Sequence, residues 1–132
     1  MSHDSNVYGY IQFDKRCNDA MQSNLQCVNN LPEAPEDRLL WRGMFNISLR
    51  PDTSSGLIHF AACYDGIEYE WEYWIGQFQR MLQSMSWDSA TVHLETLFSG
   101  SHTFNWENEE DVNASLGQHQ VRCQWTRESS FQ

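Results

Sequence analysis

The residues best suited to chemistry in this chain are His93 and Glu95, at alternate positions of a strand-like segment. A histidine and a carboxylate can form an acid–base pair, or can bind a metal ion with His59 or His102 as a third ligand. Alternate positions on one strand place side chains about 7 Å apart, which suits two ligands of one ion. Because no HExxH, CxxC or carboxylate triad accompanies them, the simpler interpretation is a pair of polar residues on a solvated sheet face.

Other catalytic signatures are missing from the sequence. No serine or cysteine lies in a nucleophile motif, and no glycine-rich phosphate-binding loop is present. The four cysteines are widely spaced and predict reduced, mostly buried thiols; they are Cys17, Cys27, Cys63 and Cys123. We therefore expect a protein that is not an enzyme and that holds no metal and no cofactor.

Negative charge is concentrated in one stretch, residues 65–111. Ten acidic residues and one basic residue, Arg80, give it −9 of the chain's net charge of −10. Such an acidic chain repels phosphate backbones and anionic membranes, so we expect neither nucleic acid nor a membrane as partner. Basic proteins are the natural partners, because complementary charge speeds encounter. The alternative is that the acidity only keeps the protein soluble.

Length and composition predict a single domain, residues 1–132, with a core of its own, since 40% of the residues are hydrophobic. The polar N-terminus has no basic segment followed by an apolar run, so we expect no signal peptide. No apolar run is long enough to span a membrane. A cytoplasmic location is the resulting expectation.

The first half of the chain predicts three strands and one helix. Residues 7–13 form a first strand, and residues 15–30 form a helix that Asp14 caps, with Met21, Leu25 and Val28 at near-helical spacing. Residues 39–49 and 57–64 are typical of strands and are joined by turn residues, which predicts a hairpin.

The second half predicts the main helix and a second hairpin. An apolar stripe marks the helix and comprises Ile67, Trp71, Trp74, Ile75, Phe78, Leu82 and Met85. Residues 90–98 then alternate strictly, and a three-residue turn at 99–101 would place Phe104 beside Thr96 and Trp106 beside Leu94. His93, Glu95, Asn105 and Glu107 then share the opposite face. Residues 108–118 form an acidic loop, and residues 121–126 a last strand.

This order of elements predicts an α+β fold. We expect an antiparallel-rich sheet of about five or six strands, with both helices packed on one face. The other face would be open to solvent and would carry His93, Glu95, Asn105 and Glu107.

Four segments resemble the Immunity protein 7 family of bacterial polymorphic toxin systems. They are residues 67–82 (IEYEWEYWIGQFQRML), 87–107 (WDSATVHLETLFSGSHTFNWE), 7–13 (VYGYIQF) and 50–60 (RPDTSSGLIHF). The resemblance rests on the order of the elements and on their aromatic and acidic pattern. It implies a small, non-enzymatic antitoxin that binds a cognate toxin protein and neutralises it stoichiometrically.

Together with the acidic stretch, the resemblance indicates which residues bind the toxin. Many such toxins are nucleases with basic clefts, where an acidic inhibitor would compete with nucleic acid. The predicted toxin-binding residues are the carboxylates Glu70, Glu72, Glu95, Glu107, Glu109, Glu110 and Asp111, with Trp87 or Trp106 as an anchor. The alternative is a small metal- or ligand-binding domain, or an enzyme, that uses the sheet face of His93 and Glu95. The oligomeric state is left open.

Overall fold

The computed structural model describes residues 4–16, 19–33, 39–49, 51–97, 100–109 and 120–128, with only the backbone described for residues 109 and 120–128. These ranges contain two helices, α1 (Ala20–Asn29) and α2 (Trp71–Gln83), and two 3-10 turns, η1 (Arg42–Met44) and η2 (Ile67–Glu70). They also contain six strands: β1 (Asp4–Asp14), β2 (Phe45–Leu49), β3 (Ser55–Asp65), β4 (Ser89–Thr96), β5 (Gly100–Glu109) and β6 (Gln120–Glu128).

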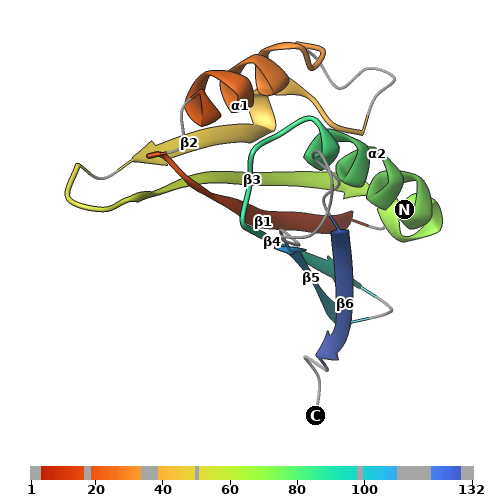
Figure 1. Cartoon of the computed structure of the whole chain (residues 1–132). Coiled ribbons are helices and arrows are strands. Elements are labelled where there is room, and N and C mark those ends of the chain that lie inside the picture. The colour runs from red at the N-terminus through yellow and green to blue at the C-terminus, as the bar shows by residue number, and fades with distance from the viewer. Residues whose placement is uncertain are drawn as a thin grey trace.

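The strands form one antiparallel sheet in the order β2-β3-β1-β4-β5-β6. The N-terminal strand β1 lies inside the sheet, between β3 and β4. Both helices cover the same face of the sheet (Figure 1). The predicted α+β fold, with an antiparallel sheet and two helices on one face, is therefore confirmed. Neither helix in the described ranges is long and apolar enough to cross a membrane.

Alternation along the strands separates a buried face from an open one. Along β1, Val7, Ile11 and Phe13 are fully buried beneath the helices, while Tyr8 and Tyr10 are exposed on the other side. The same period of two divides β4, so that the predicted assignment of His93 and Glu95 to the open face is confirmed.

The core is rich in aromatic rings that α2 packs against the sheet. Trp74 stacks on Trp71 with ring centroids 4.9 Å apart, and on Phe78 with centroids 5.2 Å apart. Phe78 also contacts Phe60 of β3 and Trp106 of β5. Ring pairs at these distances add to the stabilisation that burial provides. The predicted apolar stripe of α2 is confirmed as the face that meets the sheet.

Helix α1 is shorter than predicted and docks differently. It begins at Ala20, because Asp19 adopts a left-handed conformation with φ 68° that a helix cannot include. Asp14, the predicted cap, instead bonds Arg16. Leu25 is exposed rather than part of the buried stripe.

The polar residue Asn24 takes the buried position next to Leu25. Its side chain is fully buried; Nδ2 donates to the Ser86 carbonyl at 2.9 Å, and Oδ1 accepts from the Ser86 backbone N–H at 2.8 Å. These two bonds tie α1 to the segment after α2, and they satisfy a buried amide that would otherwise be costly.

Two strand predictions need correction. β2 begins at Phe45 rather than Leu39, because η1 precedes it, although its predicted hairpin with β3 is confirmed. In the β4–β5 hairpin, Gly100 already belongs to β5 and pairs with Thr96, so that Phe104 lies beside Val92 and not beside Thr96. Trp106 pairs with Ala90 rather than with Leu94. The apolar faces still meet, because the register differs from the predicted one by an even number of residues.

Candidate functional site

The open face of the sheet is covered by a network of polar and aromatic side chains. The Tyr8 ring stacks on His93 with centroids 5.0 Å apart, and its hydroxyl donates to Glu95 Oε1 at 2.9 Å. On the neighbouring strand, Thr103 Oγ1 lies 3.0 Å from His93 Nδ1. The two residues that the sequence singled out for chemistry are therefore held by their neighbours.

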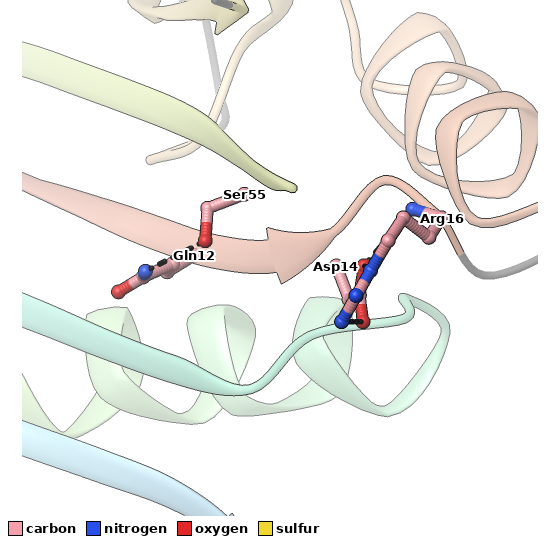
Figure 2. Close-up of polar contacts among 4 residues, drawn as sticks. All are labelled: Gln12, Asp14, Arg16 and Ser55. Carbon is pink, nitrogen blue, oxygen red and sulfur yellow. Dashed lines mark hydrogen bonds and ion pairs between the residues drawn. The ribbon is translucent and has the colours of Figure 1, made fainter. Parts of the chain in front are cut away.

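Other pairs extend this network along the face. The Thr91 hydroxyl donates to Asn105 Oδ1 at 2.9 Å, and His59 Nε2 lies 3.0 Å from Ser48 Oγ. Gln12 Nε2 donates to Ser55 Oγ at 3.3 Å (Figure 2). Neighbouring strands thus supply hydrogen-bond partners for each other's side chains across the face.

A three-ligand metal site does not assemble around His93. His59 shares the open face but stands on β3, with β1 between it and β4, and it pairs with Tyr10 in register. His102 pairs with Leu94, which places it at a helix-side position of the sheet. In the ranges that the structure describes, no group of three His, Cys, Asp or Glu side chains could hold a metal ion.

The predicted acidic residues fall into separate regions. Glu95 and Glu107 lie toward opposite ends of the β4–β5 hairpin, paired with Ser101 and Ser89. The backbone of Glu109 ends β5, but its side chain lies outside the description, as do residues 110 and 111 entirely. Of the predicted carboxylates whose side chains the structure describes, Glu70 and Glu72 alone line a common hollow.

Both predicted tryptophan anchors are buried, which corrects that part of the prediction. Trp87 is 4% exposed and Trp106 is 0% exposed. Trp106 stands at an inward position of β5, where it contacts Phe78, and the Trp87 backbone carbonyl accepts from Asn108 Nδ2 at 2.9 Å. Neither indole presents a surface to a partner, because each serves the core.

A cluster at the start of α2 combines carboxylates with exposed aromatic rings, the combination that the sequence predicted at other positions. It comprises Glu68, Tyr69, Glu70, Glu72 and Tyr73, which together line one open hollow with Trp71 at its floor. We call these five residues the acidic tyrosine surface. Tyr69 is 75% exposed and Tyr73 is 63% exposed, the highest values among the exposed large hydrophobic residues of the described ranges.

The local sequence explains how this surface is presented. Gly66 adopts φ 69°, which favours glycine, and so turns the chain from β3 into η2. Ser5 of β1 anchors the turn, since its Oγ accepts from the Ile67 N–H at 3.0 Å and donates to the Tyr64 carbonyl. Helical spacing then directs Trp74 to the core and leaves Tyr73 on the outer side.

Within the described ranges, Glu68, Glu70 and Glu72 make no ion pair. The ion pairs Arg16–Asp14 and Arg42–Glu33 lie elsewhere in the molecule. At the far end of β1, the Arg16 side chain bonds Asp14 and lowers the pKa of that carboxyl (Figure 2). Glu70 occupies the N-cap position of α2 without making a side-chain cap bond. Asp14 is thus paired with a basic residue, whereas Glu68, Glu70 and Glu72 make no ion pair within the described ranges.

Two polar atoms in the same hollow lack partners. Glu68 Oε1 and Trp71 Nε1 are each shielded from solvent and make no hydrogen bond within the part of the chain that the structure describes. Buried polar atoms are nearly always hydrogen-bonded in folded proteins, so such atoms require an explanation. Arg42 Nε, Trp106 Nε1 and Asn108 Oδ1 share this property within the described ranges, so it does not by itself mark a binding site.

Glu68, Tyr69 and Tyr73 were absent from the predicted site. A signal for them exists in the sequence, because both tyrosines fall outside the apolar stripe of α2 and are interleaved with glutamates. Aromatic residues on the polar side of an amphipathic helix are candidates for partner binding.

Known proteins give no independent guide to this site. Comparison of the chain with protein-family models, with curated proteins and with solved structures finds no match. The resemblance to the Immunity protein 7 family therefore stays a prediction, and function has to be argued from the surfaces described above.

Proposed function

We propose that this chain is an immunity protein that binds a cognate bacterial toxin domain and neutralises it as a stoichiometric, non-enzymatic inhibitor. The single observation that carries the proposal is the acidic tyrosine surface. The resemblance of the sequence to immunity proteins supplies the class of partner, and the surface supplies the chemistry by which such a partner would be held.

The charge of the surface selects a basic partner. Glu68, Glu70 and Glu72 stand within five consecutive residues and are not used in ion pairs within the described ranges. The positive end of the α2 dipole stabilises carboxylates in the first turn by about 0.3–1 kcal/mol each, which allows like charges to gather there. A basic surface meeting this cluster would gain in association rate most strongly at low salt.

The tyrosines provide contact area for a partner, which charged groups alone do not. An exposed tyrosine offers a large rigid ring at small entropic cost, and tyrosine is enriched among residues that dominate interface energies. An arginine from the partner could stack on Tyr69 or Tyr73 while donating to an adjacent carboxylate.

The decisive experiment uses paired charge reversals of equal size. The tagged full chain captures its partner from the lysate of its own source across a salt series, and the captured protein is then produced with and without the chain in a bacterial host. We expect a single partner in a 1:1 complex, arrest of growth by that partner alone, and rescue by the chain.

The variant Glu70→Lys/Glu72→Lys should slow association at low salt by at least about tenfold, because it reverses charge within the surface. The control Asp52→Lys/Asp88→Lys changes net charge equally at exposed positions outside the predicted toxin-binding residues. Equal losses in both variants would assign the effect to overall charge and remove the surface from the proposal. A partner that is harmless when produced alone would overturn the immunity function itself.

A further inference from the structure

A second feature of the helical layer is a cavity of about 270 Å³ between α1, α2 and the segments next to α1 and η1. It opens on the outer side of α2, where residues spaced by three and four positions line it: Tyr73, Gln77, Arg80 and Met81. Its volume is just below the range of about 300–1,000 Å³ that is usual for small-molecule sites. Neither the fold nor the proposed function requires this cavity.

The walls of the cavity are largely apolar. Leu31, Pro32 and Leu40 line one side, and Met81 lines the other. Cys27 also contributes, and burial raises the pKa of its thiol, so that it stays uncharged at neutral pH. The Cys27 Sγ lies 3.8 Å from the Met81 carbonyl. The lining thus favours an apolar body rather than a chain of water molecules.

Among the described residues that line the cavity, Arg80 is the one charged group and none is acidic. Arg80 is also the one basic residue of the stretch 65–111. Within the described ranges Arg80 belongs to neither ion pair. Side chains of a helix lean toward its N-terminus, and Gln77, one turn before Arg80, lines the same cavity. A guanidinium beside apolar walls is well suited to a carboxylate with an apolar body.

We propose that this cavity is a binding site for a small organic carboxylate, with the apolar part of the ligand between Leu31, Leu40 and Met81 and the carboxylate on Arg80. The site goes beyond the proposed immunity function and does not depend on it, since it can be measured on the isolated protein. Tyr73 lies at the boundary of the cavity and the acidic tyrosine surface, so the two sites are adjacent.

The test uses three probes of nearly equal shape: 3-phenylpropionate, its neutral amide, and the cation 3-phenylpropylamine. Backbone amide shifts in two-dimensional NMR locate the binding and yield dissociation constants. We expect 3-phenylpropionate to shift residues of α2 and of the segment around Leu31, with a dissociation constant on the order of 1 mM. The amide should bind about tenfold more weakly, and the cation more weakly still.

Variants separate the charge of the site from its shape. Arg80→Gln should reduce the affinity for 3-phenylpropionate about tenfold and leave that of the amide unchanged, as a thermodynamic cycle requires if the carboxylate meets Arg80. Arg16→Gln, which removes the same charge at a residue that does not line the cavity, should change neither. Gln77→Trp, which fills the cavity from a half-buried position, should abolish binding of both. Equal affinities for acid and amide, or an absence of localised shifts at millimolar concentrations, would overturn the proposal.

Discussion

Two pairs of exposed tyrosines distinguish the two surfaces of this protein. Tyr8 and Tyr10 on the open sheet face are 38% and 37% exposed, whereas Tyr69 and Tyr73 beside α2 are 75% and 63% exposed. The Tyr8 hydroxyl is bonded to Glu95 and its ring is stacked on His93. The acidic tyrosine surface has carboxylates of the same type, but its glutamates are not bonded to its tyrosines within the described ranges.

This contrast indicates which of the two surfaces can gain new hydrogen bonds and ring contacts from a partner. On the open face, the polar groups of Tyr8, Glu95 and His93 are bonded to neighbouring strands, and a partner that used them would have to replace existing bonds. At the start of α2, carboxylates and tyrosine rings are presented to solvent without such bonds, so a partner gains interactions without breaking others. Side chains of the open face should therefore contribute to stability, and those of the acidic tyrosine surface should not.

The largest expected effect comes from the close approach of β1 and β4, the two strands that bring Tyr8 and His93 together. A Cβ on Gly9 would lie 1.9 Å from the Thr91 carbonyl oxygen, so Gly9→Ala forces β1 and β4 apart. We expect the free energy of unfolding, measured by urea denaturation, to fall by about 3 kcal/mol or more.

Gly76 of α2, near the acidic tyrosine surface, provides the matched control. No atom lies within 4 Å of a Cβ added there, so Gly76→Ala should stabilise the protein by about 0.5–1 kcal/mol through helix propensity. If Gly9→Ala were tolerated as well as Gly76→Ala, the open face would not depend on close approach of the two strands.

The second-largest expected effect is the loss of stability when the Tyr64 hydroxyl, which is buried under the helices, is removed. Tyr64 donates to the Leu39 carbonyl and accepts from Trp74 Nε1 at 3.1 Å. Tyr64→Phe leaves both groups without this partner, and we expect a loss of about 1–3 kcal/mol in urea denaturation at neutral pH.

Titration of Tyr64 gives this prediction a second readout. Burial raises the pKa of Tyr64 from its ordinary 10.0 to about 12, and the Trp74 hydrogen bond partly opposes the rise. An acid whose pKa rises on folding keeps its full stabilising effect below the unfolded pKa and loses it as the pH rises through the folded pKa. Wild-type stability should thus fall between about pH 10 and 12 more steeply than that of Tyr64→Phe. Parallel pH curves would contradict burial of this hydroxyl.

The sequence predicted which side chains lie on each face of the sheet better than it predicted the register of the strands. Alternation in residues 90–96 is a local property, and it correctly placed His93 and Glu95 on the open face. The hairpin register was wrong, because shifting a strand by an even number of residues keeps each side chain on its face. In the structure, Gly100 has a φ of 78° and is the first residue of β5, which fixes the register of the hairpin.

The candidate site was predicted only in part, for a related reason. Glu70 and Glu72 were identified from charge, which is visible in the chain, but burial of Trp87 and Trp106 depends on which elements cover them. Because Trp106 lies on the apolar face of its own strand, the sequence pattern itself favours a buried Trp106 over an exposed interface anchor. The exposure of Tyr69 and Tyr73 likewise depends on tertiary structure, because nothing in the sequence states that η2 and the outer side of α2 remain uncovered.

A smaller effect is expected on the open face itself. Tyr8→Phe removes the hydrogen bond to Glu95 but keeps the stack on His93, and should cost about 0.5–1 kcal/mol in urea denaturation. Tyr10→Phe, on the same strand and equally exposed, has no such bond to Glu95 and serves as the control. A loss for Tyr8→Phe no greater than that for Tyr10→Phe would show that the network on this face does not stabilise the fold.

The smallest effect on stability, and the one that completes the comparison, is expected for Tyr69→Phe and Tyr73→Phe. Both rings project from the acidic tyrosine surface into solvent, so each change should alter the free energy of unfolding by less than about 0.5 kcal/mol. Truncation of the rings, in Tyr69→Ala/Tyr73→Ala, should likewise leave urea denaturation nearly unchanged and yet weaken binding of the captured partner at least about tenfold. A stability loss as large as that of Tyr8→Phe would mean that these tyrosines serve the fold, and the contrast between the two surfaces would then disappear.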